Sequence, residues 1–189
     1  MNITSAKFVK GIVGPDEILN NPKPHIAFIG RSNVGKSSLI NALAKQKDLA
    51  KTSSFPGRTQ QINFFLINNA FYLVDLPGYG YAKGSKDMQT EIQRLIYWYF
   101  FESEIEQKKV ILIIDASVGL TTTDSQMLMS LNSSNKEVII VANKIDKVNK
   151  TLQSKQLKEI QSSVGKHKVF PVSAEKKIGL NELTLEMLK

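Results

Sequence analysis

The chain contains no cysteine, which excludes disulfide bonds, thiolate metal sites and cysteine nucleophiles. It also lacks long hydrophobic runs: residues 110–114 form one of the longest, far below the roughly 20 apolar residues of a membrane span. The first residues, MNITSAKFVKGIVG, lack the apolar core of a secretory signal peptide. We therefore expect a soluble, cytoplasmic protein without a membrane partner.

Acidic residues are comparatively scarce. The 189 residues include 25 Lys and Arg against 17 Asp and Glu, which gives a net charge of +8. The surplus is largest between residues 144 and 177, where Lys outnumbers Asp and Glu by nine to three. Such a surplus suits a polyanionic partner, although charge alone does not identify it. A solvated basic face without a partner explains the same charge equally well.

Internal repeats, low-complexity tracts and interdomain linkers are also missing, so we expect a single domain of ordinary size. Short apolar segments alternate with longer segments of helical pattern, as in parallel sheets buried on both faces. The predicted fold is a three-layer α/β/α domain with a mostly parallel six-stranded sheet that has one antiparallel strand. The expected strands are residues 25–29, 62–67, 71–75, 110–115, 137–142 and 168–172, and the expected helices are residues 36–45, 86–107, 122–132, 150–164 and 180–188.

Two smaller features refine this organisation. Residues 1–24 are expected to form an extension before the domain, which covers residues 25–189. The aromatic run YWYFF, residues 97–101, lies on the expected second helix. Packing against the sheet is favoured for this run over a base-stacking site, because large aromatic side chains dominate protein cores. Five consecutive residues cover every side of a helix, so one or two are expected at the surface.

Residues 30–37, GRSNVGKS, match the phosphate-binding pattern G-x-x-x-x-G-K-[ST] between an expected strand and helix, the context that the motif requires. Gly30 and Gly35 let the backbone wrap closely, so that its N–H groups can point at phosphate oxygens. The N-terminus of the following helix adds a favourable partial charge. Lys36 can reach the β- and γ-phosphates, and the Ser37 hydroxyl can coordinate Mg²⁺.

A second motif, N-K-x-D, follows the strand expected at residues 137–142. Guanine presents two adjacent donors on its Watson–Crick edge, and the Asp146 carboxylate can accept both. Adenine would place an acceptor against that carboxylate, and an unpaired buried polar group is costly. Asn143 can hold N7 of the base and the neighbouring loop, the Lys144 stem can pack along the base, and the Ala174 N–H can meet O6. A surface turn is the default for this motif in isolation.

A third motif, D-x-x-G, begins at Asp75 at the end of an expected strand. The Asp75 carboxylate can hold Mg²⁺ through water, and the Gly78 N–H can sense the γ-phosphate. Thr59, in the loop before the hairpin, is the natural second hydroxyl for Mg²⁺. In small GTPases a Gln orients the attacking water. Directly after Gly78 this chain has Tyr79, which cannot supply an amide, so we do not assign Tyr79 a catalytic role.

Together these stretches resemble the EngB family of bacterial GTPases, through GRSNVGKSSLINAL, PGRTQ with INFF, DLPGYGYA and NKID. The resemblance covers roughly residues 26–174. It implies a Ras-like G domain, GTP with Mg²⁺, a role in assembling the large ribosomal subunit through that subunit or its rRNA, and a link to normal cell division and septation. The chain departs from the T-K-x-D form more frequent in the family, because Asn143 replaces Thr.

The sequence therefore predicts a slow, monomeric GTPase switch. The candidate catalytic residues are Lys36, Asn33 and Thr59. Asn33 is included because related GTPases with an Asn at this loop position use K⁺ beside the phosphates. A GTP-dependent rRNA- or ribosome-binding module with negligible hydrolysis is the alternative, whereas the Asp146 motif disfavours an ATPase or kinase. The predicted GTP-binding residues are Gly30, Arg31, Ser32, Asn33, Val34, Gly35, Lys36, Ser37, Ser38, Gly57, Arg58, Thr59, Gln60, Gln61, Asp75, Leu76, Pro77, Gly78, Asn143, Lys144, Ile145, Asp146, Val172, Ser173 and Ala174, with Mg²⁺ on Ser37, Thr59 and Asp75.

Overall fold

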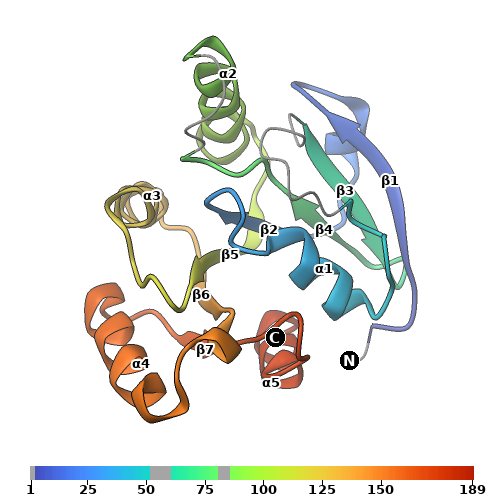
Figure 1. Ribbon diagram of the computed structural model, residues 1–189. Helices are drawn as coiled ribbons and strands as arrows, with labels where there is room; N and C mark the ends of the chain where they lie inside the picture. The colour runs from blue at the N-terminus through green and yellow to red at the C-terminus, as the bar shows by residue number, and fades with distance from the viewer. Residues whose placement is uncertain (1–2, 52–60, 81–85) are drawn as a thin grey trace.

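The computed structural model describes residues 3–51, 61–80 and 86–189. Their strands form a seven-stranded sheet of order β1-β3-β4-β2-β5-β6-β7 (Figure 1). The strands are β1 (Ala6–Ile12), β2 (His25–Gly30), β3 (Ile62–Ile67), β4 (Phe71–Asp75), β5 (Gln107–Asp115), β6 (Val138–Asn143) and β7 (Val169–Pro171). The helices are η1 (Glu17–Asn20), α1 (Lys36–Ala44), α2 (Lys86–Tyr97), η2 (Trp98–Glu102), α3 (Thr122–Ser133), η3 (Ile145–Lys147), α4 (Lys150–Val164) and α5 (Leu180–Met187).

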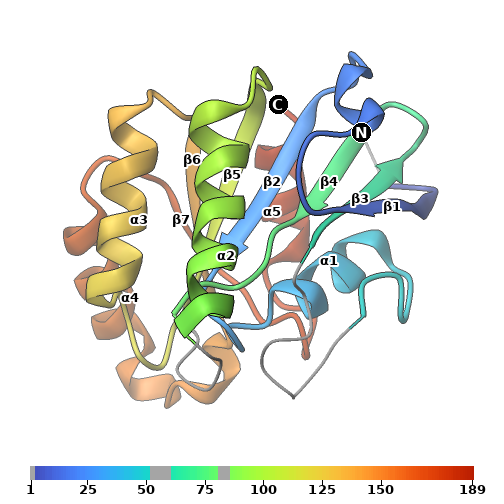
Figure 2. The same ribbon diagram turned by 90° about the horizontal axis from the view of Figure 1, so that it is seen from above.

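The helices cover both faces of the sheet. Buried side chains of α2, α3 and α4 share one apolar core with one set of strand residues. Those of α1 and α5 share a second core with the alternate strand residues, such as Phe28 and Ile111. Figure 2 shows α2 and α3 side by side in front of the sheet, with α5 behind it. This confirms the predicted three-layer α/β/α fold.

The central strands are parallel, as their apolar sequences predict. β2 pairs with β4 and β5, β5 with β6, and β6 with β7, all in parallel. Every residue of β2 and β6 is buried, because helices cover both faces. β3 is antiparallel to β4 across the predicted hairpin. One consequence is that the carboxyl ends of β2, β4, β5 and β6 meet at one edge of the sheet.

The sheet has seven strands where the sequence predicts six. The additional strand, β1, comes from the segment expected to precede the domain, and it pairs antiparallel with β3. Only Ile12 of this strand is buried, while Phe8 and Val9 are about half exposed. Lys7 and Lys10 interrupt its apolar pattern, as is common on edge strands. Such a strand is recognised by its pairing rather than by its own periodicity.

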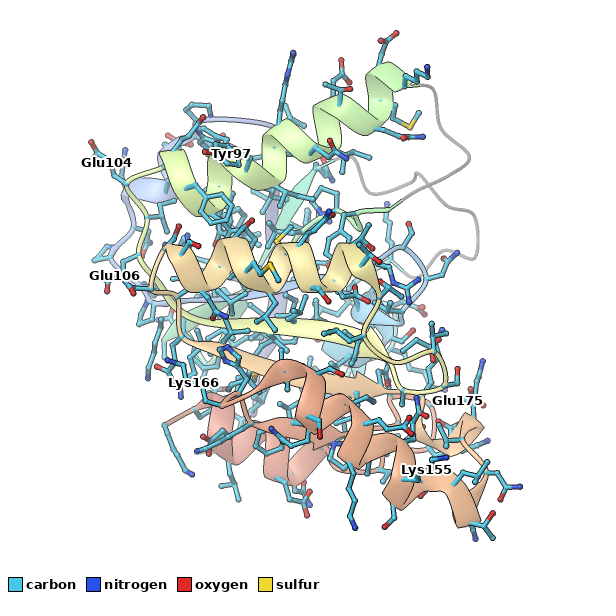
Figure 3. The ribbon with its side chains drawn as sticks, turned by 90° about the vertical axis from the view of Figure 1, so that its left-hand side faces the viewer. Tyr97, Glu104, Glu106, Lys155, Lys166 and Glu175 are labelled. Carbon is cyan, nitrogen blue, oxygen red and sulfur yellow. The ribbon has the colours of Figure 1, made fainter. Side chains whose placement is uncertain are left out.

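The second helix ends earlier than predicted. α2 stops at Tyr97, and the aromatic run continues as a π-helical turn up to Glu102 before β5 begins. Tyr99 and Phe100 are fully buried in the core, whereas Tyr97 is 56% exposed (Figure 3). The structure thus confirms core packing with limited exposure for this run. Within the described ranges, no helix is both long and apolar enough to cross a membrane.

Candidate functional site

The predicted phosphate loop connects β2 to α1 and bends at residues with positive φ. Asn33 has φ of 66° and Gly35 of 91°. A side chain at Gly30 would lie 2.4 Å from the carbonyl oxygen of Ile113 on β5, so only glycine fits there. The first in-helix hydrogen bond of α1 runs from Leu39 N to Gly35 O, at 2.9 Å. The N–H groups of the first turn, residues 36–38, therefore remain available for an anion.

Lys36 and Ser37 both contact Asp75, which ends β4. Lys36 Nζ lies 2.6 Å from Asp75 Oδ1, and the Ser37 hydroxyl donates to Asp75 Oδ2 at 3.1 Å. Lys36 and Asp75 are 8% and 2% exposed, so this is a buried ion pair. A hydroxyl and a carboxylate side by side are oxygen ligands of the kind that Mg²⁺ prefers. No group of three or more His, Asp or Glu side chains arranged to hold a metal occurs in the described ranges.

The N-K-x-D motif joins the phosphate loop to the loop after β7. Asn143 Nδ2 donates to the Val34 carbonyl at 2.8 Å, and Asn143 Oδ1 accepts from Ala174 N at 3.2 Å. A side chain at Gly35 would lie 2.5 Å from Asn143 Nδ2, so the two motifs are in close contact. Asn143 is buried, and its amide holds the phosphate loop and the loop after β7 together, which agrees with the prediction that it holds the neighbouring loop. Its contact with N7 of the base stays a prediction. Val172 and Ser173 are also buried.

Asp146 has a buried carboxylate oxygen that is unpaired. Its Oδ1 makes no hydrogen bond to any residue that the structure describes. An acceptor in this condition is costly unless a ligand supplies a donor. Lys144 adopts φ of 62° and donates to the Asn33 carbonyl at 2.7 Å. The geometry at the end of β6 therefore fits a ligand that presents hydrogen-bond donors to Asp146.

Asp115 belongs to the site although sequence reasoning missed it. It ends β5 beside Asn143 in the register, and its Oδ2 lies 2.8 Å from Lys144 Nζ. Burial alone would raise the pKa of Asp115, but hydrogen bonds from Lys144 and Ser117 bring the pKa below its ordinary value. The carboxyl-end position was the signal that could have found this residue.

The segment after β4, residues 75–80, runs alongside the phosphate loop. A side chain at Gly78 would lie 2.9 Å from both the Cα and N atoms of Ser32. Leu76 and Tyr79 are buried, and Tyr79 turns towards α3. Its hydroxyl donates to Asp124, which also accepts from Arg31 of the phosphate loop. Asp124 also forms a capping box with Thr121 at the start of α3.

Some predicted residues lie outside this constellation. Gly57, Arg58, Thr59 and Gln60 fall outside the described residues, so the predicted second Mg²⁺ hydroxyl stays a prediction. Gln61 is exposed, and its amide donates to Asn63 Oδ1 at 3.0 Å on the β3 side of the sheet.

Comparison with known proteins places the chain in a family. Residues 25–144 match the family model described as 50S ribosome-binding GTPase, and residues 106–189 match the elongation factor Tu GTP-binding domain. The probable GTP-binding protein EngB of Clostridium kluyveri is 48% identical over 164 residues, which cover 87% of this chain and 83% of that protein.

Two solved structures share the fold. A probable GTP-binding protein EngB superposes with a TM-score of 0.73 at 22% identity, over 87% of this chain and 96% of that one. Era in complex with MgGDPNP and nucleotides 1506–1542 of 16S ribosomal RNA superposes with a TM-score of 0.70 at 27% identity, over 87% of this chain and 55% of Era.

Fold and family model together define a GTPase built on a G domain. The chain belongs to the EngB family of GTP-binding proteins.

Proposed function

We propose that the chain is a slow, Mg²⁺-dependent GTPase switch that acts in assembly of the large ribosomal subunit. The observation that carries the nucleotide part is the Asn143 amide, which joins the Val34 carbonyl of the phosphate loop to Ala174 beyond β7. This contact brings the predicted phosphate and base motifs together at the edge of the sheet where β2 and β6 end. Binding at that edge would span both motifs, as a nucleoside triphosphate does.

Guanine selectivity follows from Asp146. The Asp146 carboxylate, one oxygen of which is buried and unpaired, would accept the N1–H and the N2 amine of guanine, whereas adenine would place its N1 acceptor against the carboxylate. Competition between ATP and GTP for the protein tests this point. If ATP competes as effectively as GTP, the result would support the kinase or ATPase alternative.

Mg²⁺ would be held by Ser37 and, through water, by Asp75, with Thr59 as the further predicted ligand. When bound, the ion neutralises phosphate charge. Lys36 can then form an ion pair either with Asp75, as in the structure, or with the phosphates. We propose that nucleotide binding moves Lys36 from the first to the second.

Slow hydrolysis is expected because no amide follows Gly78. Tyr79 is buried, and its hydroxyl points towards Asp124. Unassisted GTPases of this type can turn over at ~10⁻⁴ s⁻¹. An activator must therefore supply the function of the missing water-orienting amide.

K⁺ is the proposed activator, through Asn33. This residue is exposed in the phosphate loop, with its carbonyl held by Lys144. Hydrolysis measured in K⁺ and Na⁺ buffers should be faster in K⁺ for the wild type, and Asn33→Ala should remove the difference. Equal rates in both buffers for the wild type would reject this part of the proposal.

The ribosomal part is supported by the family model and by charge. Lys147, Lys150, Lys158, Lys166 and Lys177 are exposed, and none pairs with a carboxylate elsewhere in residues 3–51, 61–80 and 86–189. Figure 3 shows the face that carries α3 and α4, with Lys155 and Lys166 on it. Contacts between such lysines and rRNA phosphates would weaken steeply with salt.

A pelleting assay with large ribosomal subunits tests this surface. Lys150→Glu with Lys158→Glu should lower binding and flatten its salt dependence, because two phosphate contacts are lost. The single variant Lys150→Glu has Lys7→Glu as its matched control, since Lys7 is an exposed lysine on β1 at the opposite edge of the sheet. Equal loss with both variants would indicate a non-specific charge effect. Binding indifferent to salt and to GTP analogue against GDP would reject the ribosomal role.

The alternative function is a GTP-dependent rRNA- or ribosome-binding module with negligible hydrolysis. GTP hydrolysis in K⁺ buffer, with and without large subunits, separates the two: a rate that rises with subunits supports the switch, and no turnover in either condition supports the module. We further propose that the protein is a cytoplasmic monomer and is needed for normal cell division and septation. Its G domain would comprise residues 25–189 together with β1.

A further inference from the structure

Tyr79 occupies the position where a water-orienting amide is expected, yet its side chain is 6% exposed. Its hydroxyl donates to Asp124 Oδ1 at 2.7 Å, although the two residues are 45 positions apart. Burial, reinforced by the Asp124 carboxylate, raises the pKa of the Tyr79 hydroxyl well above its ordinary value. The hydroxyl therefore stays protonated and acts as a hydrogen-bond donor at physiological pH.

Asp124 is a buried hub that connects three parts of the chain. It is fully buried, and its Oδ2 accepts from Arg31 Nε at 3.2 Å and from the Thr121 backbone N–H at 3.0 Å. A buried carboxylate is tolerated only when donors satisfy it. The phosphate loop supplies one donor, the segment after β4 a second, and the start of α3 the rest. Each connection is therefore required by the same buried charge.

The main chain reinforces this connection. Ser32 N donates to the Tyr79 carbonyl at 3.0 Å, and Tyr79 N donates to the Gly30 carbonyl at 3.3 Å. Gly78 lies against the Ser32 backbone, where even a methyl group would come within 2.9 Å. Gly80 has φ of 69° and packs near the Arg31 side chain. The backbone of residues 78–80 is thus fixed along the phosphate loop on both sides of Tyr79.

We propose that Tyr79, Asp124 and Arg31 form a latch that holds the Gly78 N–H in register with the phosphate loop, so that it can report the γ-phosphate. Tyr79 is then a positioning residue, because its hydroxyl acts through the backbone of Gly78 and not on the nucleotide. This inference rests on the proposed role of Gly78.

The latch has a specific consequence for nucleotide discrimination. GDP has no γ-phosphate, so its binding does not depend on where the Gly78 N–H lies. Binding of a GTP analogue does depend on it, because a hydrogen bond weakens steeply when its geometry is lost. Weakening the latch should therefore change the ratio of the two affinities, whereas a general loss of stability should leave the ratio unchanged.

Tyr79→Phe removes the hydroxyl and keeps the packed ring. We expect the affinity for a non-hydrolysable GTP analogue to fall about tenfold, with GDP affinity within about twofold of wild type. Tyr99→Phe is the matched control: it also removes a buried hydroxyl, which lies 3.2 Å from His25 Nδ1 in the core away from the site. This control should keep the wild-type ratio, and thermal melts should show whether the two variants are equally folded.

The outcomes separate the latch from the wider proposal. Wild-type protein that binds neither nucleotide would reject the proposed function. Wild-type protein that binds both, with an unchanged affinity ratio in Tyr79→Phe, would overturn the latch alone. A changed ratio in Tyr99→Phe as well would also overturn it, because it would show that any buried hydroxyl has this effect.

Arg31→Gln provides a second variant in case Tyr79→Phe does not fold. The Arg31 side chain is 25% exposed, so its replacement disturbs the core less. We expect the same direction of change in the affinity ratio, and restoration towards the wild-type ratio by Arg31→Lys. An unchanged ratio in a folded Arg31→Gln protein would overturn the latch.

Discussion

The candidate site has two halves, for which we propose base binding and switching, and the two are built in different ways. The base-binding half comprises Asn143, Lys144, Asp146 and Ala174 at the ends of β6 and β7. There the Asn143 side chain is bonded to backbone atoms, at 2.8 Å to the Val34 carbonyl and 3.2 Å to Ala174 N. Both partners are backbone atoms of loops that lie next to strand ends, so we expect this half to keep its shape whichever nucleotide is bound.

The switch half comprises Lys36, Ser37, Asp75 and Tyr79. There side chains contact other side chains: Asp75 binds Lys36 at 2.6 Å and Ser37 at 3.1 Å. Lys36 and Ser37 are also the predicted ligands of the phosphates and Mg²⁺, so they can exchange Asp75 for the nucleotide. From this difference we expect that affinity for guanine and discrimination between GTP and GDP can be changed separately.

The largest effect is expected from Asp146→Asn in the base-binding half. Replacing the carboxylate exchanges one acceptor for a donor and opposes the guanine amine, so GTP and GDP affinities should both fall on the order of a hundredfold or more. Xanthine nucleotides, which carry an oxygen in place of that amine, should bind better to the variant than to wild type. Equilibrium titration with all three nucleotides measures this. Lys147→Ala, at an exposed neighbouring residue, should leave the affinities unchanged.

The next effect concerns the buried pair in the switch half. Without nucleotide, Lys36→Ala leaves the Asp75 carboxylate buried without its cation, and the free energy of unfolding should fall by about 3 kcal/mol. Urea unfolding measures this loss. Adding Asp75→Ala should recover part of the stability and none of the phosphate affinity. A double variant less stable than either single variant would show that the pair does not act as a unit.

A loss of stability of similar size is expected at the start of β2, in the core away from both halves of the site. His25 is buried among Phe64, Tyr72 and Tyr99, and burial lowers the pKa of this imidazole from 6.5 to about 4. Between these values the unfolded chain binds a proton that the folded protein does not, so stability falls as the pH is lowered from 6.5 towards 4. The full loss should be about 3 kcal/mol.

Urea unfolding across this pH range tests the prediction on His25. The slope should be absent in His25→Gln, which has no imidazole to titrate. The ratio of GTP-analogue to GDP affinity should not follow this slope, because His25 lies in the core away from both halves. A slope that persists in the variant would assign the pH dependence to other groups.

The smallest effect is expected from Lys144→Ala in the base-binding half. It removes a partly exposed ion pair with Asp115 and a hydrogen bond to the Asn33 carbonyl. GTP and GDP affinities should fall together by about tenfold or less. A fall for GTP alone would contradict the division between the halves.

Local pattern predicted much of this structure. Continuous apolar runs identify β2, β5 and β6, and the phosphate-loop motif places the start of α1 at Lys36, because burial and glycine geometry leave local marks in sequence. The sequence did not predict β1, because Lys7 and Lys10 interrupt its apolar pattern. This edge strand is defined only by its pairing with β3. The π-helical turn at the end of α2 has no local pattern of its own.

The contacts that organise the site were less predictable. Tyr79 meets Asp124, and Lys144 meets Asp115, across 45 and 29 positions of the chain. Such pairs depend on which strand ends adjoin, and therefore on the order of strands in the sheet. For Asn143 the motif predicted a contact with the neighbouring loop, whereas the identity of its partners, Val34 and Ala174, required the fold.

The division between the halves is tested most directly by comparing the affinity ratio for a GTP analogue and GDP in Asp146→Asn and Asp75→Asn. We predict that Asp146→Asn lowers both affinities by the same factor and keeps the wild-type ratio. Asp75→Asn should shift the ratio, because it weakens the contacts that exchange with the phosphates and Mg²⁺. A shifted ratio in Asp146→Asn, or an equal loss for both nucleotides in Asp75→Asn, would contradict the account.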